Sequence, residues 1–437
     1  MADIKQGRPP TEEEEEPRAS GEETAGASRS FASDVLEGGA GPSWLRALSI
    51  PVLAILTALV LGALLIVFTD STSLHAWASF FRDPIGALSA SWTAVREAYQ
   101  ALFTGALGSP SEIAGAIGSG DLHRITLSLN PLSETVIAST PLIFAGLSVA
   151  LGFRAGLFNI GAEGQINVGA IAAASVGFSF AGLPGPLHLT LIVGAGFLGG
   201  ALWGGIPGYL KAKTGAHEVI TTIMMNYISY YLVDYLLLSS FFQRPGRTDP
   251  ISKPVTAFFP HLLGQDLRLN AGIFVALLMA IVTAWLLNRS TVGFQFKAVG
   301  ANPDAARTAG MSPGRTFVWA MALSGALAGL GGAVQLASVS PSLTPGFSSG
   351  YGFDAIALAL LGKAKPSGVV AAAFLLGALR AGARSMQAAT STPIDIVTVI
   401  EALVIVFVAA PAVVRGIYRI KAQRAEGPQV LTKGWGA

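Results

Sequence analysis

Four polar side chains interrupt an apolar stretch of this sequence. The segment FRAGLFNIGAEGQINVGA, residues 153–170, contains Asn159, Glu163, Gln165 and Asn167 between two uncharged runs, each long enough to cross a bilayer. On a helix, Asn159, Glu163 and Asn167 lie four residues apart and form one polar stripe. A carboxylate at membrane depth is costly unless it faces a cavity or a partner, so these three residues are candidates for contact with a passing solute.

The polar stripe has two interpretations, which the sequence leaves open. Three glycines between residues 156 and 164 loosen the segment, as expected of a broken helix whose freed backbone groups line a cavity. Alternatively, the stripe is a structural knot that hydrogen-bonds the segment to a neighbour such as Arg154 or Arg380. The closeness of Glu163 to Arg154 favours the structural role, because it places the carboxylate toward the cytoplasmic side rather than the midplane.

The second candidate lies in two short apolar pieces, 351–361 and 367–379, which GKAKP separates. Each piece is short for a span, and discontinuous segments of this kind often mark a translocation path because half-helix ends present unpaired backbone groups to a solute. The first piece begins with Tyr351, Phe353 and Asp354. Aromatic faces beside a carboxylate suit a planar, hydroxylated ligand, although aromatic residues also anchor helices at the membrane interface.

The third candidate is the polar stretch VGANPDAARTAGMSPGR, residues 299–315, between two apolar spans. It contains a helix-start signal, an ion pair at i,i+3 spacing, a compact face of small residues and a terminating glycine: Asn302 with Pro303, Asp304 with Arg307, Ala305 with Ala306 and Ala309, and Gly310. These features predict a short surface helix. A bare loop between spans needs no such helix, so we expect it to be a docking element for a partner.

The candidates belong to a chain with the composition of a membrane protein. Of its 437 residues 51% are hydrophobic and 12% are charged, and its mean hydropathy is +0.56, whereas soluble domains carry about 25% charged residues. The sequence therefore predicts an all-α polytopic membrane protein with about ten transmembrane helices and discontinuous segments. The expected spans are 47–69, 133–153, 158–181, 187–210, 217–241, 269–288, 314–339, the two short pieces, and 393–414. Glycines at every fourth position in 196–208 predict close helix packing.

The distribution of charge orients the chain and separates its tails. With the N-terminus inside, the inner segments carry 15 Lys and Arg and the outer segments 7, so we expect both termini in the cytoplasm. Residues 1–40 hold ten acidic and four basic side chains and few apolar ones, which predicts a disordered acidic tail. We expect the membrane domain to occupy 41–420 and a second cytoplasmic tail to occupy 421–437.

The sequence also argues against several classes of function. It has no cysteine, and therefore no disulfide or thiolate nucleophile. It has no G-x-x-x-x-G-K-[ST] phosphate loop, and neither a histidine–carboxylate metal spacing nor a Ser–His–Asp set stands out. We therefore expect no enzymatic activity, no metal site, no cofactor and no nucleic-acid partner.

Three motifs in order carry a family resemblance: GLFNIGAEGQ after a span, EVITTIMMNYI at 218–228, and VGANPDAARTAGM between spans. Together they resemble the membrane subunit of ABC importers, in the family of the ribose and branched-chain amino acid permeases, and more closely its nucleoside branch. The resemblance covers about 47–420. It implies a homo- or heterodimer of permeases in the cell membrane, separate ATPase subunits that bind the ATP, and an extracytoplasmic substrate-binding lipoprotein.

The resemblance also assigns a role to the third candidate. The segment 300–311 matches the family's coupling helix, which sits in a groove of the ATPase and transmits nucleotide-driven closure. We accordingly expect the contacts with the ATPase to involve Gly300, Asn302, Ala305, Ala306, Arg307 and Gly310.

The expected function is that of a permease subunit that imports purine or related nucleosides. A permease for a simple sugar is one alternative, because the external binding protein, which carries most of the specificity, is not in this sequence. An ion-coupled secondary transporter that uses Glu163, Asp234 or Glu401 as relays is another, and a channel or membrane scaffold is a third.

Overall fold

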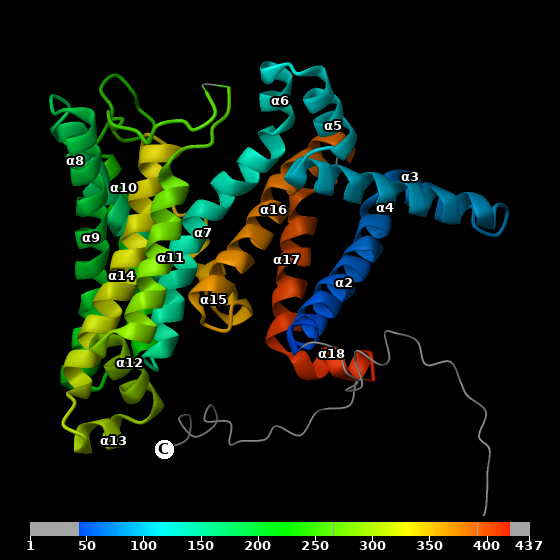
Figure 1. Cartoon of the computed structure of the whole chain (residues 1–437). Coiled ribbons are helices and arrows are strands. Elements are labelled where there is room, and N and C mark those ends of the chain that lie inside the picture. The colour runs from blue at the N-terminus through cyan, green and yellow to red at the C-terminus, as the bar shows by residue number, and fades with distance from the viewer. Residues whose placement is uncertain (1–42, 265, 391, 420–437) are drawn as a thin grey trace, which may run out of the picture. The chain divides into compact units, whose positions relative to one another are not determined.

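The structure is a computed structural model that describes residues 43–264, 266–390 and 392–419. The chain divides into two units, Met1–Ser49 and Ile50–Ala437, and nearly all described residues belong to the second (Figure 1). The predicted tails, 1–40 and 421–437, lie outside the described residues. Within the described ranges the regular structure is helical, with two isolated β-bridges and no strand.

Seventeen helices follow one another along the described chain. They are α2 (Ser43–Thr69), α3 (Ser71–Ala78), α4 (Pro84–Leu107), α5 (Pro110–Ser119), α6 (Leu122–Ser128), α7 (Asn130–Arg154), α8 (Ala162–Ser179), α9 (Gly185–Thr214), α10 (Glu218–Leu237), α11 (Gly272–Arg289), α12 (Thr291–Ala301), α13 (Pro303–Thr308), α14 (Pro313–Ser338), α15 (Tyr351–Leu361), α16 (Pro366–Thr390), α17 (Ile394–Ala409) and α18 (Pro411–Ile417).

Six of the described helices are long and apolar enough to cross a membrane: the Pro51–Thr69 part of α2, and α7, α9, α11, α14 and α16. A seventh span results if α17 and α18, which meet at a bend of 91°, are counted as one. The all-α membrane class is therefore confirmed. The count of ten crossings and the cytoplasmic position of both termini stay predictions.

The helices pack into two apolar clusters. The larger includes Leu147 of α7, Ile166 of α8 and Leu327 of α14, and the smaller includes Ile66 of α2 and Leu102 of α4. Helix α16 contributes to both clusters, and most residues of α7 are buried. The central helices are thus positioned by side chains on all their faces.

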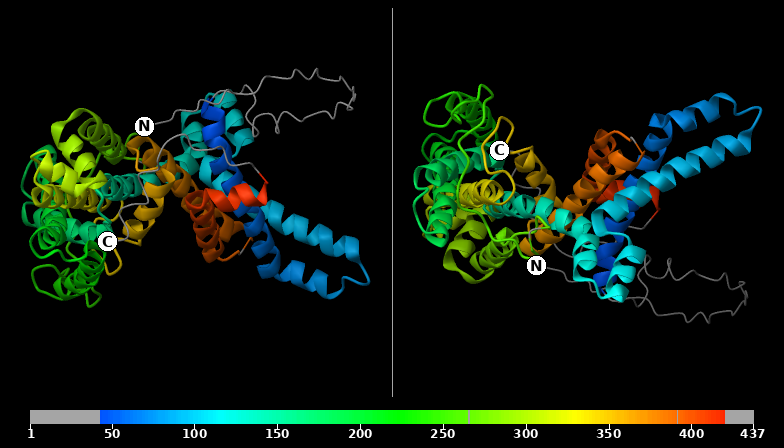
Figure 2. Two further views of the ribbon diagram at one scale, coloured as in Figure 1. Left: turned by 90° about the horizontal axis from the view of Figure 1, so that it is seen from below. Right: turned by 90° about the horizontal axis from the view of Figure 1, so that it is seen from above.

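Small residues set the spacing of α8, α9 and α14, which lie side by side (Figure 2). A Cβ added to Gly325 would lie 2.2 Å from the Gly200 carbonyl oxygen, and one added to Gly169 would lie 2.3 Å from the Gly329 Cα. The backbones are therefore in direct contact. In lipid the hydrophobic effect does not drive helices together, so the dispersion energy of this close contact stabilises the bundle. This confirms the predicted packing role of the glycines in 196–208.

Two loops pair at the end of the bundle opposite α13 (Figure 1). The loop after α10 donates backbone hydrogen bonds from Ser252 to the Leu343 carbonyl and from Val255 to the Pro341 carbonyl, in the loop after α14. The two ends of the bundle are thus distinct, one carrying the paired loops and the other the short helix α13.

Candidate functional site

Asn159 does not belong to the helical stripe that the sequence suggested. Helix α8 begins at Ala162, so Asn159 lies in the non-helical break between α7 and α8. Its fully buried amide donates to Gln165 Oε1 at 2.8 Å, to Ser324 Oγ at 2.7 Å and to Ser148 Oγ at 3.2 Å. The side chain ties the break to α7 and α14, which is a structural role.

Glu163 holds the beginning of α15 in place. Its Oε1 accepts hydrogen bonds from Ser348 Oγ at 2.5 Å and from the Gly350 N–H at 3.1 Å, and its Oε2 accepts one from the Gly352 N–H at 2.7 Å. A negative charge beside the free N–H groups of a helix start is favourable. The carboxylate, 2% exposed, therefore caps a helix that lies almost two hundred positions further along the chain.

The expected arginine partners of Glu163 were wrong. Arg154 donates instead to the carbonyls of Ala364 and Lys363, and Arg380 pairs with Asp354. Tyr230, which lies past the midpoint of α10, donates its hydroxyl to Glu163 at 3.3 Å. The carboxylate is therefore beside the middle of α10 rather than at the end where that helix begins.

The three residues at the start of α15 have different environments. Asp354 forms an ion pair with Arg380, whose Nε lies 3.8 Å from Glu401 Oε2. The Arg380 guanidinium also lies 5.2 Å from the centroid of the Tyr351 ring, at cation–π distance. Phe353, by contrast, is 47% exposed. The candidates Tyr351 and Asp354 are thus held in a charged cluster between α15, α16 and α17.

Asn167 lies apart from the other stripe residues. Its Nδ2 donates to Ser229 Oγ of α10 at 3.4 Å, and the residue is 1% exposed. The structure therefore does not bring the six predicted path residues into one site. Asn159 faces α7 and α14, Glu163 caps α15, and Asn167 faces α10.

The predicted docking helix is present as α13. Asn302 Oδ1 accepts hydrogen bonds from the N–H groups of Asp304 and Ala305, both at 3.0 Å, and Arg307 lies 3.4 Å from Asp304. Gly310 follows with a φ of 85°, a conformation that favours glycine. The capping, the ion pair and the terminating glycine are confirmed.

The surface of α13 is narrower than the sequence suggested. Ala306 is 4% exposed and packs inward, whereas Ala305 and Ala309 are exposed. Gly300 belongs to the preceding helix, α12, because α13 begins at Pro303. A Cβ on Gly300 would lie 2.7 Å from the backbone of Ala155 and Gly156. The helix before α13 therefore touches the break between α7 and α8 directly.

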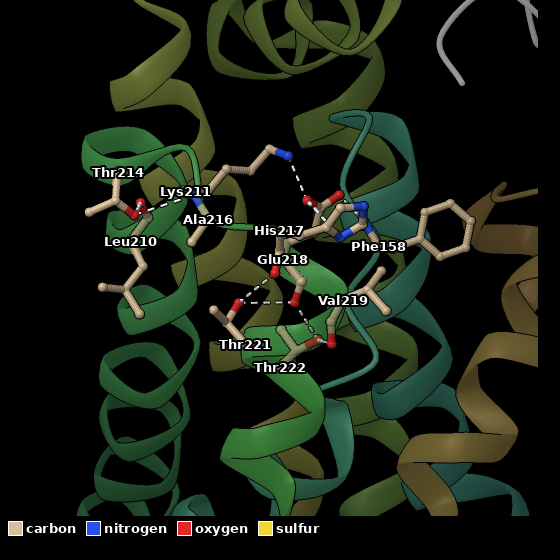
Figure 3. Close-up of polar contacts among 10 residues, drawn as sticks. All are labelled: Phe158, Leu210, Lys211, Thr214, Ala216, His217, Glu218, Val219, Thr221 and Thr222. Atoms are coloured by element: carbon tan, nitrogen blue, oxygen red, sulfur yellow. Dashed lines mark hydrogen bonds and ion pairs between the residues drawn. The ribbon is translucent and has the colours of Figure 1, made fainter. Parts of the chain in front are cut away.

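A buried carboxylate that the sequence candidates did not include holds the other side of this break (Figure 3). Glu218, the first residue of α10, lies 2.5 Å from Lys211 Nζ and accepts a hydrogen bond from the Phe158 N–H at 3.5 Å. Asn226 of the same helix donates to the Ile160 carbonyl at 2.9 Å and accepts from the Gly164 N–H at 2.8 Å. In the sequence, the eight-residue spacing of Glu218 and Asn226 on one helix face could have identified these two residues as candidates.

Comparison with known proteins decides the family. The branched-chain amino acid transport system / permease component family matches residues 132–409. The chain belongs to this family. The match includes the break, α10 and α13, and the two nucleoside relatives described below are named as transport permeases rather than enzymes.

Three relatives show the range of the similarity. A guanosine ABC transporter permease of Bacillus subtilis is 42% identical over 65% of this chain and 82% of its own length. A nucleoside ABC transporter permease of Lactococcus lactis is 34% identical over 84% of this chain and 92% of its own. A glucose ABC transporter permease of Haloferax volcanii is 36% identical over 63% of this chain and 75% of its own length. No solved structure matches the chain.

The permease is an integral membrane protein and the transmembrane component of an ABC importer. The break, with its contacts to Gly300 on one side and to Glu218 and Asn226 on the other, links α12, the helix before α13, to α10 within this component. The described part of the permease contains no group of three His, Asp or Glu residues placed to hold a metal ion.

Proposed function

We propose that this permease imports nucleosides, with purine nucleosides as the first candidates. The observation that carries the substrate class is the similarity to relatives named for guanosine and for nucleosides, the second of which aligns with most of the chain. A separate ATPase subunit binds the ATP, and the permease itself carries no cofactor.

In this proposal the ATPase docks on α13. Ala305 and Ala309 offer a small, exposed surface that fits into a groove, and Arg307 stands exposed beside them. Movement of α13 reaches the break through the Gly300–Gly156 contact, and the break is hydrogen-bonded to Glu218 and Asn226 of α10. A short chain of rigid contacts thus joins the docking element to the centre of the bundle.

The assembly that we propose contains a second permease subunit and an extracytoplasmic binding lipoprotein, all surrounded by membrane lipid. The lipoprotein delivers the solute to the end of the bundle that carries the paired loops, opposite α13 (Figure 1). Solute therefore enters at one end of the permease, and the energy of ATP enters at the other.

Uptake of labelled guanosine by cells that carry the native system tests the proposal. We expect guanosine to accumulate, and we expect unlabelled adenosine, but not glucose, to inhibit this accumulation. ATP depletion should stop the accumulation. It should persist when an uncoupler removes the proton gradient while ATP is held constant. Deletion of the permease gene should abolish it, and the plasmid-borne gene should restore it. Accumulation of glucose in place of nucleosides would contradict the substrate class.

A simple sugar is the second candidate substrate, because one relative is named for glucose. The glucose arm of the same uptake experiment decides between the two classes. An ion-coupled mechanism finds less support, since the Glu163 carboxylate is occupied by four hydrogen-bond donors and Glu401 faces Arg380. Collapse of uptake with the uncoupler would revive it.

A further inference from the structure

We propose that Asn167, Tyr230 and Asp234 form a solute-binding site that accepts the adjacent hydrogen-bond donors of a neutral, hydroxylated solute. The inference deepens the proposed function and rests on it for the identity of the solute as a nucleoside. The position of the site and its demand for donors come from the geometry alone.

The site is a cavity of about 160 Å³ where α8, α10 and the loop after α14 meet. Its lining residues are Asn167, Tyr230, Val233, Asp234, Pro345 and Gly346. Pro345 and Gly346 belong to one of the paired loops, so the cavity lies toward the end of the bundle opposite α13. That is the end at which the proposed importer receives its solute.

The polar groups around the cavity are hydrogen-bond acceptors without donors. Asn167 is buried, and its Oδ1 has no hydrogen-bond partner among the residues that the structure describes. The Tyr230 hydroxyl donates its hydrogen bond to Glu163, which leaves the hydroxyl oxygen free to accept one. Asp234 is exposed and takes part in none of the ion pairs formed by the described residues.

Unpaired acceptors of this kind define the ligand. A buried carbonyl oxygen without a donor costs free energy, and a bound solute that supplies the donor removes this cost. Asp234 adds a negatively charged acceptor to the lining of the same cavity. The complementary solute group carries two or more adjacent O–H or N–H donors.

The volume limits how much of the solute the cavity holds. Pockets that enclose a whole drug-sized ligand have volumes of about 300–1,000 Å³, so a cavity of about 160 Å³ takes part of a nucleoside. Two parts of guanosine have the required chemistry: the vicinal hydroxyls of the ribose and the N–H edge of the base. The experiment below separates them.

The absence of cysteine from the chain makes a direct test possible. Pro345→Cys places one thiol on the wall of the cavity without changing its three polar residues, and Thr248→Cys places one on the exposed part of the other loop. The assembled transporter, with its ATPase and binding protein, is labelled with a membrane-impermeant thiol reagent with and without guanosine.

We expect guanosine to slow labelling at position 345 and not at position 248. At about ten times the half-maximal concentration, simple occupancy predicts slowing of about tenfold. Equal rates with and without solute, or equal slowing at both positions, would overturn the proposal. Protection by sodium or potassium ions alone would also overturn it, since the acceptors would then hold a cation.

Substitution of Asp234 tests the donor requirement in the Pro345→Cys background. Asp234→Asn replaces an acceptor oxygen by a donor and should raise the guanosine concentration needed for protection about tenfold or more, whereas Asp249→Asn in the exposed loop should not. If 2′,3′-dideoxyguanosine fails to protect the Pro345→Cys protein that is otherwise unchanged, the site takes the ribose. If inosine fails instead, it takes the base edge.

The outcome is separable from that of the proposed function. If glucose rather than guanosine is transported and protects position 345, the site stands and the nucleoside assignment fails. If guanosine is transported but does not protect position 345, the nucleoside assignment stands and the site fails.

Discussion

At the residue scale, Glu163 illustrates how a costly buried charge is stabilised. The sequence indicates that this carboxylate needs a partner, and the knot interpretation is the one that the structure favours. The donors are Ser348 and the backbone N–H groups of Gly350 and Gly352, which the sequence could not identify because they are far away along the chain. The sequence thus predicted that Glu163 would be hydrogen-bonded within the protein, but it did not predict which residues would be the donors.

Removal of the Glu163 carboxylate should destabilise the protein. Glu163→Ala leaves the buried Ser348 hydroxyl, the buried Gly352 N–H and the partly buried Gly350 N–H without an acceptor. We therefore expect the melting temperature in detergent to fall by about 5 °C or more. Glu163→Gln keeps one acceptor oxygen and should lie between Ala and the parent. Fluorescence-detected size-exclusion chromatography after heating measures the order. An unchanged melting temperature for Glu163→Ala would contradict the capping role.

The charged cluster around Arg380 leads to a second prediction at this scale. Arg380→Met removes the cation that pairs with the half-buried Asp354 and lies beside the buried Glu401. Breaking a buried ion pair in this way lowers the free energy of unfolding by about 3–5 kcal/mol. Arg384→Met, one turn away, breaks an exposed pair with Glu134 and should cost about 0–1 kcal/mol.

The same heating assay compares the two arginine variants. The double variant Arg380→Met/Asp354→Asn should recover part of the lost stability, because it removes one of the two unpaired charges. Equal melting temperatures for Arg380→Met and Arg384→Met would show that the buried cluster contributes no more to stability than the exposed pair.

At the element scale, local signals were the most reliable. Helix α13 was predicted with its cap, ion pair and terminator, since all three depend on residues within a few positions of one another. The start of α8 was predicted about four residues early because apolar composition continues through the break. Which face of α13 is buried depended on α12 and α14, and composition could not show it.

Two adjacent glycines test the packing of α9 on α14. A Cβ on Gly204 would lie 2.5 Å from the Met321 carbonyl oxygen, whereas one on Gly205 would lie 3.8 Å from the nearest atom, the Ala322 Cβ. Gly204→Ala should therefore destabilise the protein by about 1–3 kcal/mol, and Gly205→Ala should be neutral. Melting temperatures of the two purified variants decide, and a neutral Gly204→Ala would contradict the close approach.

The contact between α12 and the break leads to a prediction about coupling. Gly300→Ala forces the backbones at Gly156 apart, so we expect uptake to fall several-fold while the ATPase still co-purifies. Gly314→Ala is the matched control, because its Cβ would lie at an ordinary 3.5 Å from Ala212. Normal uptake by Gly300→Ala would show that the contact transmits nothing.

At the scale of the whole molecule, composition predicted the membrane class and the family motifs predicted the importer. Neither showed how the polar segments meet. The role of the break after α7 depends on its contacts with Gly300 and Glu218, which the fold places on its two sides. The cavity at Asp234 likewise requires α8, α10 and a distant loop together. Long-range contacts are the part of the site that sequence patterns leave open.

The most direct test of the account is the amount of ATPase that co-purifies with the permease from native membranes in mild detergent. The parent chain and Thr248→Arg, in the loop at the opposite end, should retain a stoichiometric ATPase subunit. Ala305→Arg should lose it and abolish uptake, while its level in the membrane is unchanged, because a long charged side chain cannot enter the groove that accepts α13. Recovery of the ATPase with Ala305→Arg, or purification of the parent chain alone under conditions that keep a control importer intact, would contradict the account.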